Sequence, residues 1–238
     1  MKHVFLLLLV FCGSINGAVP EQILQNIEYI LSREEKPLVI GIGGCPGVGK
    51  STFATLLLQE LSEKNIRSVI LSFDDFGKTQ EEKKGLKNEL DIKRIRWNDL
   101  YSVLEEIKLG NKKVAVPKIN QLKKERTEQI LNLDEVDLIL FEGMYVLSNA
   151  QDLRLRPYVD LGIYMETTTE NICHWKWERE LKKTTPRTKE QFEAHMSLIF
   201  EDFIRFVYPT KQNADWVLFA NNDHELIVVP LQRRPNLN

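Results

Sequence analysis

One stretch of the sequence decides the fold: Leu38-Val39-Ile40-Gly41-Ile42-Gly43-Gly44-Cys45-Pro46-Gly47-Val48-Gly49-Lys50-Ser51. Its first five residues read as a buried strand, and the glycine-rich turn Gly44–Ser51 fits the pattern G-x-x-x-x-G-K-[ST]. Such a match arises by chance in about one chain of this length in a hundred. A helix is predicted directly after it, over residues 50–64, so the turn lies in a strand–turn–helix context.

This turn predicts a phosphate-binding loop. Its glycines let the backbone bend so that N–H groups point at phosphate oxygens, and the helix adds the positive end of its dipole. A lysine at the seventh pattern position brings a charge to the outer phosphates, and the hydroxyl after it can hold Mg²⁺. Cys45 and Pro46 occupy variable positions and are interpreted as loop filling. The predicted nucleotide-binding residues are Gly44, Gly47, Val48, Gly49, Lys50, Ser51 and Thr52.

Further short apolar runs follow at regular intervals. Strands are predicted at residues 68–71, 137–141, 161–164 and 216–219, and they alternate with helical stretches. Because this order is typical of a parallel sheet covered by helices, we expect an α/β fold with helices on both faces of a parallel five-stranded sheet. With the phosphate-binding turn, this is the three-layer sandwich of a P-loop NTPase. A helix is also predicted over residues 19–36, before the first strand.

Carboxylates follow two of the predicted strands. Asp74 and Asp75 come after the second strand and Glu142 ends the third. The carboxyl ends of parallel strands meet at one edge of the sheet, where active sites of this architecture lie. An aspartate there can accept the proton of an attacking hydroxyl, and a glutamate beside the loop can hold Mg²⁺ with Ser51. Taken singly, each carboxylate could equally be a solvated turn or strand cap.

Composition narrows the class of protein. The chain has 238 residues, enough for one sizeable domain, here expected over residues 37–238. Its formal net charge of −2 argues against nucleic acid as a partner. Three cysteines fit no zinc or disulfide pattern. The sequence does not fix whether the chain forms a homo-oligomer.

The first 18 residues resemble a secretory signal peptide. Lys2 and His3 precede the apolar run Val4–Cys12, and small residues follow up to Ala18. The run is too short for an ordinary membrane-spanning helix, so no stable membrane association is expected. Export would separate the protein from ATP, which favours a cytoplasmic working site; both localisations stay open.

With these motifs in place, residues 37–222 resemble the uridine kinases and their relatives, the phosphoribulokinases and bacterial pantothenate kinases. Leu71–Phe76 is similar to the family motif after the second strand, and the family's catalytic aspartate falls on Asp74, not Asp75. Phe141–Leu147 is similar to the metal-side motif, with Glu142 in the metal role, and Tyr208–Asp215 is similar to a segment typical of uridine kinases. The resemblance implies transfer of the ATP γ-phosphate to a hydroxyl of a nucleoside or similar metabolite, with Asp74 and Lys50 catalytic and Mg²⁺ required.

The substrate-binding region, expected at about residues 77–130, departs from uridine kinases. In Val116-Pro117-Lys118-Ile119-Asn120 the family's tyrosine and aspartate are replaced by Ile119 and Asn120, and its base-recognising histidine falls on Lys124. Arg126 matches a family arginine. Lys124 and Arg126 are the substrate candidates. With Lys93, Arg94, Arg96 and Lys123 they would suit an anionic acceptor, although a solvated basic surface is an equal alternative.

A lid is expected at about residues 174–190, because the family closes a basic helix and loop over ATP in this region. Arg179 and Arg187 are candidates for phosphate contacts, and Lys176 is a further basic candidate assigned to the substrate. Two alternatives to a nucleoside kinase remain. The chain could phosphorylate a non-nucleoside acceptor such as pantothenate, glycerate or a sugar phosphate, or it could bind nucleotide as an interaction protein without turnover.

Overall fold

Short continuous apolar runs build a central sheet whose two faces are both buried. The computed structural model describes residues 18–33, 37–79, 81–84, 92–120 and 125–230. Within them, the main sheet has the strand order β10-β9-β8-β1-β5-β2. The strands are β1 Leu38–Gly44, β2 Ser68–Ser72, β5 Leu138–Glu142, β8 Leu161–Glu166, β9 Trp216–Ala220 and β10 Leu226–Val229.

The sheet has six strands, and the expectation of five was wrong. The five predicted strands are present and parallel to their neighbours, and β10 pairs antiparallel with β9 through the register Leu226↔Ala220. The turn Asn221–Glu225 makes this hairpin possible, because the Asn221 side chain accepts hydrogen bonds from the backbone of Asp223 and Glu225. β10 has four residues and none of them is fully buried, so its hydrophobic signal is weak.

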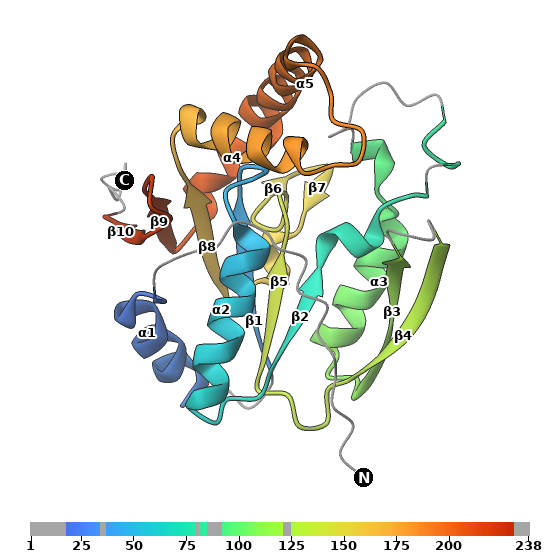
Figure 1. Cartoon of the computed structure of the whole chain (residues 1–238). Helices are drawn as coiled ribbons and strands as arrows, with labels where there is room; N and C mark the ends of the chain where they lie inside the picture. Colours follow the sequence, from blue (N-terminus) through green and yellow to red (C-terminus); the bar gives the residue numbers. More distant parts are fainter. Residues whose placement is uncertain (1–17, 34–36, 80, 85–91, 121–124, 231–238) are drawn as a thin grey trace.

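Two apolar cores lie on opposite faces of the sheet, because successive strand side chains point to opposite sides. One face packs against α1 Glu21–Leu31, α2 Lys50–Glu63 and part of α5. The other face packs against α3 Trp97–Lys108, the turn η1 Phe73–Phe76 and the segment Tyr145–Leu147. Figure 1 shows α1 and α2 in front of the sheet and α3 on the right, beside the hairpin of β3 and β4. The layers are those of a three-layer sandwich.

The region expected to bind the acceptor forms a separate wall beside the carboxyl ends of β2 and β5. It contains η1, η2 Ile92–Arg94, α3 and an antiparallel hairpin of β3 Lys113–Asn120 and β4 Glu125–Asn132. A bridge between Gly77 and Ile95 joins the segment after η1 to the segment before α3. This wall therefore brings three stretches of sequence to one side of the sheet.

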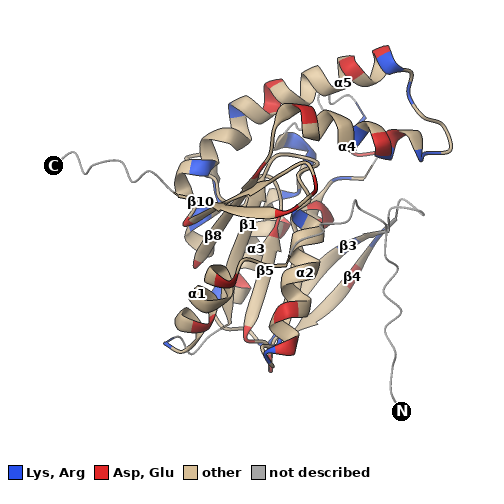
Figure 2. Cartoon of the chain, turned by 60° about the vertical axis from the view of Figure 1, so that its left-hand side comes forward, with Lys and Arg blue, Asp and Glu red and all other residues tan. Residues whose placement is uncertain are grey.

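Helices α4 Thr169–Leu181 and α5 Lys189–Asp202 lie across the end of the sheet where the phosphate loop is found, and both views show them side by side (Figures 1 and 2). Thr168 and Thr188 cap them, each accepting a hydrogen bond from the backbone N–H three residues later. After α5 come a π-helical turn, η4 Phe203–Val207, and a 3₁₀ segment, η5 Tyr208–Asn213. The remaining short elements are β6 Asn149–Ala150, β7 Leu153–Arg154 and η3 Arg156–Tyr158.

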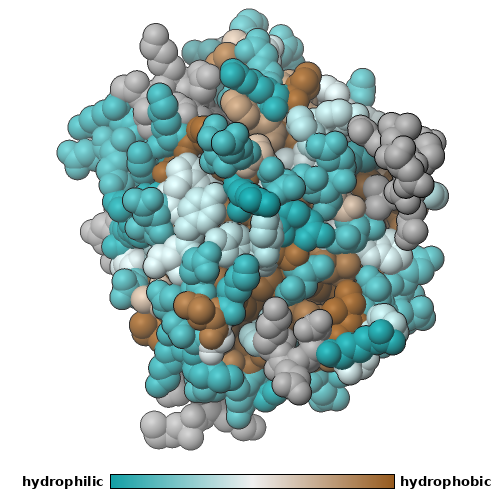
Figure 3. All heavy atoms as spheres, turned by 180° about the vertical axis from the view of Figure 1, so that it is seen from behind, coloured by the Kyte–Doolittle hydropathy of each residue, from teal (hydrophilic) through white to brown (hydrophobic). Residues whose placement is uncertain are grey.

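The face seen from behind is mostly hydrophilic, with apolar residues gathered around the middle and lower part (Figure 3). No helix in the described part of the chain is both long and apolar enough to cross a bilayer. Residues 1–17, most of the signal-like segment, lie outside the described residues.

Candidate active site

The turn after β1 forms a compact loop that backbone geometry requires to be glycine-rich. Gly44, Gly47 and Gly49 all have positive φ angles, of 132°, 93° and 96°. A Cβ at Gly44 would also lie 2.1 Å from the Met165 carbonyl oxygen on the neighbouring strand. Gly49 then stands directly before the first residue of α2, so the loop leads into a helix N-terminus that offers free N–H groups to an anion.

Lys50 is the buried cation of this loop. It is 8% exposed, and its Nζ donates hydrogen bonds to the carbonyls of Gly44 and Cys45, both at 3.0 Å. Burial lowers the pKa of Lys50, while the negative charges of Glu142 and Asp74 oppose that shift. The lysine is thus held inside the loop by two carbonyl groups and two nearby carboxylates.

Cys45 is the variable loop residue beside Lys50. It is 1% exposed, and burial raises the pKa of its thiol to about 12. The thiol is therefore protonated at neutral pH and packs as a small apolar side chain, as the sequence interpretation held.

Glu142 ends β5 directly beside the loop. Its two carboxylate oxygens accept hydrogen bonds from Ser51 Oγ at 3.2 Å and from Ser72 Oγ at 2.6 Å. The residue is 5% exposed, and burial raises the pKa of its carboxyl group, against the hydrogen bonds of the two serines and the charge of Lys50. The pair predicted to hold a metal, Ser51 and Glu142, is therefore in direct contact.

Gly143 lets the turn η1 pack close to this carboxylate. A Cβ at this position would lie 2.2 Å from the Cβ of Phe73, so only glycine allows η1 to pack against the end of β5. Phe73 is fully buried and packs against the rings of Trp97 and Tyr145. Asp74 follows it, and its charge acts on both Lys50 and Glu142.

The two aspartates of η1 have different surroundings. Asp75 forms an ion pair with Lys118 at 2.5 Å and accepts a hydrogen bond from the backbone N–H of Ile119 at 3.3 Å. Its carboxylate therefore fastens the β3–β4 hairpin to η1. The Asp74 carboxylate has no hydrogen-bond partner among the described residues, so it is the one of the two that is available to a substrate hydroxyl.

Helix α4 carries basic residues to the phosphate loop. Arg179 Nη2 donates a hydrogen bond to the Gly47 carbonyl at 3.2 Å. A Cβ at Gly47 would lie 3.0 Å from the Cε of Lys176, so the stem of this lysine runs against the loop. Lys176 therefore lies against the loop, and its assignment to the substrate stays a prediction.

Arg187, the other predicted phosphate contact, is bound to Glu180 at the end of α4. Its Nη1 donates to Glu180 Oε2 at 2.9 Å and its backbone N–H donates to Oε1 at 3.1 Å, while Lys183 Nζ donates to Oε2 at 2.6 Å. Although burial raises the pKa of Glu180, these hydrogen bonds outweigh it and the pKa falls to about 2. Glu180 therefore fixes the loop between α4 and α5.

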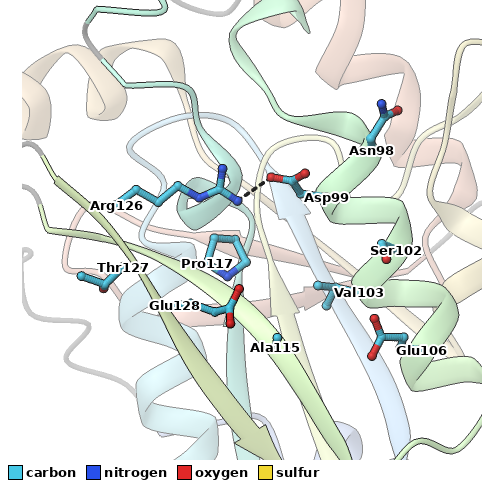
Figure 4. Close-up of a pocket in the computed structure, with 10 residues that line it drawn as sticks. All are labelled: Asn98, Asp99, Ser102, Val103, Glu106, Ala115, Pro117, Arg126, Thr127 and Glu128. Atoms are coloured by element: carbon cyan, nitrogen blue, oxygen red, sulfur yellow. Dashed lines mark hydrogen bonds and ion pairs between the residues drawn. The ribbon is translucent and has the colours of Figure 1, made fainter.

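Arg126 is one of the two basic substrate candidates of the acceptor region. It forms an ion pair with Asp99 on α3 at one end of a pocket of about 570 Å³ (Figure 4). This pocket lies between α3 and the hairpin, and the close-up shows Glu106 and Glu128 on its two walls. Lys124, the other candidate, lies outside the described residues.

With this geometry established, comparison with known proteins identifies the family. Residues 39–226 match the model of the phosphoribulokinase/uridine kinase family. The chain belongs to this family. Its members are kinases, so the chain is assigned to the phosphotransferases with a P-loop nucleotide-binding site.

Individual members of the phosphoribulokinase/uridine kinase family resemble the chain at low identity. The chain is 29% identical over 183 residues to a pantothenate kinase of Vibrio vulnificus. The match covers 70% of the chain and 56% of that protein, so the chain spans just over half of that relative's length. It is 24% identical over 201 residues to a uridine kinase of Ureaplasma urealyticum, covering 83% of the chain and 94% of that protein. A solved D-glycerate 3-kinase from Cryptococcus neoformans shares the fold, with a TM-score of 0.65 and 17% identity over 87% of the chain and 97% of that structure.

The residues present fit the groups that a kinase of this family binds. Thr52 Oγ1, in the first turn of α2, is buried and finds no hydrogen-bond partner among the residues that the structure describes. The loop before it supplies backbone N–H groups, so both can serve a nucleotide phosphate. Ser51 and Glu142 offer a hydroxyl and a carboxylate oxygen, the ligand types that suit Mg²⁺ when phosphates complete its coordination.

Several residues that contact the candidate site were missed by sequence reasoning. Ser72 is opposite Glu142 in the β2–β5 register, and counting to the last residue of both strands could have paired them. Asp75, Lys118 and Asp99 join the hairpin and α3 to the site through side-chain ion pairs. These contacts link residues 27 to 43 positions apart, and no local pattern indicates them.

Proposed function

We propose that this chain transfers the γ-phosphate of ATP to a hydroxyl group of a small metabolite, in the presence of Mg²⁺. One observation carries the proposal: a buried lysine after β1, a carboxylate at the end of β5 bonded to the loop serine, and an aspartate after β2 that has no hydrogen-bond partner in the described part of the chain interact electrostatically. These are the three kinds of group that phosphoryl transfer requires, namely a charge on the phosphates, a metal ligand and a base.

The roles of the residues follow from their positions. The loop amides, Lys50 and Arg179 bind and neutralise the phosphates. Asp74 accepts the proton of the acceptor hydroxyl while the acceptor oxygen bonds to phosphorus and the bond from phosphorus to the bridging oxygen of ADP breaks. Bound Mg²⁺ supplies charge neutralisation, and Ser51 with Glu142 would hold it.

The first experiment is an acceptor panel with purified protein, ATP and Mg²⁺, scored by ADP release and by mass of the product. Uridine, pantothenate, D-glycerate and a sugar phosphate represent the acceptors of the relatives and of the wider family. Lys50→Ala and Asp74→Asn should each reduce kcat by about 10³-fold or more, because each removes a group used in the transition state.

Two further measurements separate the roles of Lys50 and Asp74. Lys50→Ala should also weaken nucleotide binding, whereas Asp74→Asn should leave it unchanged. Lys112→Ala is the matched control, because this exposed lysine lies with Pro37, Arg67 and Asp137 at the opposite edge of the sheet. Transfer that survives Lys50→Ala would contradict the proposed function, as would the absence of any product together with firm ATP binding.

A further inference from the structure

The carboxylate of Glu142 accepts hydrogen bonds of different length from two serine hydroxyls. Ser72 Oγ donates to Glu142 Oε1 at 2.6 Å, within the range of about 2.5–2.7 Å that is typical of a charge-assisted O–H···O⁻ bond. Ser51 Oγ donates to Glu142 Oε2 at 3.2 Å, longer than the limit of about 3.0 Å for ordinary O–H···O bonds. One oxygen of the carboxylate is therefore bound firmly and the other loosely.

The firm bond comes from the neighbouring strand. Ser72 is the last residue of β2, Glu142 is the last residue of β5, and the parallel register places them opposite each other. Backbone pairing already joins the two strands from Ser68↔Leu138 onwards, so their register does not depend on this side-chain bond. The Ser72 hydroxyl therefore acts on the carboxylate itself, at the edge of the sheet where the phosphate loop lies.

Burial makes the carboxylate depend on these two donors. Glu142 is 5% exposed, so protein groups rather than bulk water must supply most of its hydrogen bonds. In the described part of the chain, the donors to it are Ser51 and Ser72. In the proposed function Ser51 serves the metal ion. Ser72 is therefore the donor that can fix the carboxylate without being a metal ligand itself.

We propose that Ser72 is a positioning residue of the metal site: its hydrogen bond fixes Oε1 of Glu142, so that Oε2 is available to Mg²⁺ on the Ser51 side. The inference rests on the proposed function and concerns how the same site binds its metal ion. A carboxylate with one oxygen fixed loses less conformational freedom when the metal binds. Removal of a group that orients a metal ligand typically lowers metal affinity by about 10- to 100-fold.

Metal binding without turnover tests this role. Calorimetry on the full chain measures how tightly ADP binds at a series of Mg²⁺ concentrations, which gives the affinity of the ADP complex for Mg²⁺. Ser72→Ala should weaken that affinity about 10-fold, while ADP binding without metal stays as in wild type. Ser72→Thr keeps a hydroxyl at this position and should restore most of the affinity for Mg²⁺. A merely structural role would weaken ADP binding with and without metal alike.

Two further variants connect the effect to Glu142. Ser68→Ala is the matched control, because Ser68 lies at the opposite end of β2 and its hydroxyl donates to the Ile66 carbonyl at 3.2 Å. This control should leave the affinity for Mg²⁺ unchanged. Ser72→Ala added to Glu142→Gln should weaken Mg²⁺ binding little further, because the carboxylate through which Ser72 acts is already lost.

Ser72→Cys keeps the test available if Ser72→Ala does not fold. The thiol is close in size to the hydroxyl but is a weak hydrogen-bond donor, so this variant should also lower the affinity for Mg²⁺.

The outcomes separate this inference from the proposed function. Weaker Mg²⁺ binding by Ser72→Ala, without phosphate transfer by wild type to any acceptor, would support the inference and contradict the kinase activity. Phosphate transfer by wild type with an unchanged Mg²⁺ affinity in Ser72→Ala would do the reverse. An equal loss of Mg²⁺ affinity in Ser68→Ala, or a fully additive loss in the Glu142→Gln background, would also overturn the inference.

Discussion

The phosphate side and the acceptor side of this site are built in different ways. On the phosphate side, one continuous stretch supplies the loop, the lysine and the metal-side serine, and its polar contacts use mainly backbone atoms. On the acceptor side, η1, the segment before α3 and the hairpin meet from three places in the sequence. Side-chain ion pairs such as Asp75–Lys118 and Arg126–Asp99 hold them together, and their members are partly exposed.

The difference shows which part of a site can vary without loss of the fold. Glycines with positive φ and a buried lysine tolerate little change, because backbone conformation and burial fix them. Partly exposed ion pairs contribute about 0–1 kcal/mol each and can be exchanged one at a time. A family can therefore keep one phosphate loop while its members bind different acceptors, and substitutions on the two sides should have effects of different size and kind.

After Lys50→Ala and Asp74→Asn, the largest effect is expected for Glu142→Gln, on the phosphate side. The amide keeps the shape but loses the charge that the metal requires, so kcat/KM should fall by about 10²–10³-fold. Titration of activity against Mg²⁺ is the measurement, and partial recovery at high Mg²⁺ is expected. Ser72→Ala is the comparison variant, since it removes only a hydrogen bond to the carboxylate and should lower activity far less.

The same substitution should stabilise the fold above acid pH. Burial raises the pKa of Glu142, so the folded chain holds its proton to higher pH than the unfolded chain. The contribution of Glu142 to stability is present below the pKa that it has in the unfolded chain. It is lost as pH rises through the pKa that it has in the folded chain. In urea unfolding, the free energy of unfolding of Glu142→Gln should increase relative to that of wild type as pH rises from 4 to 8. An unchanged difference across this range would contradict the burial argument.

Glu180→Gln tests the loop between α4 and α5, where the lid is predicted, with an intermediate effect expected. The pKa of about 2 means that Glu180 stabilises the fold above its ordinary pKa, and that this stability is lost as pH falls from about 4.5 towards 2. At neutral pH the variant should lose about 2 kcal/mol, allowing for the partly exposed Lys183 and Arg187. Thermal unfolding measures the loss, and a loss that persists at pH 2.5 would show that packing, not charge, is responsible.

The parallel strands and the phosphate loop were predictable from sequence because short apolar runs and a fixed glycine spacing determine them locally. Asp74 and Glu142 were also predictable, since each follows a strand whose carboxyl end must lie at the same edge of the sheet. The roles predicted for these residues stay predictions. Ser51 and Glu142 touch, whereas the assignment of Arg187 to phosphate stays a prediction beside its observed bond to Glu180.

The rest could not be predicted because it depends on pairings across the fold. The family resemblance assigned the catalytic role to Asp74, but no local pattern indicates what Asp75 does. Its anchoring role depends on the hairpin, more than 40 residues later, whereas Asp74 has no hydrogen-bond partner among the described residues. Likewise β10 has too few buried residues to produce a strong strand pattern. It forms where the Asn221 turn brings the chain back alongside β9.

The smallest effect is expected for Asp75→Asn, on the acceptor side, where a double-mutant cycle with Lys118→Met can isolate the ion pair. Asparagine still accepts the Ile119 N–H but cannot pair with Lys118, so the hairpin should be held less firmly against η1. We expect KM for the acceptor to rise about 3- to 5-fold with little change in kcat at saturation or in KM for ATP. Adding Lys118→Met to Asp75→Asn should raise KM for the acceptor little further, because the ion pair is already broken. Fully additive effects of the two substitutions on KM for the acceptor, or an equal rise in KM for ATP, would mean that Asp75 does not act through the hairpin. The phosphate side and the acceptor side would then not be independent of one another at η1, the turn that joins them.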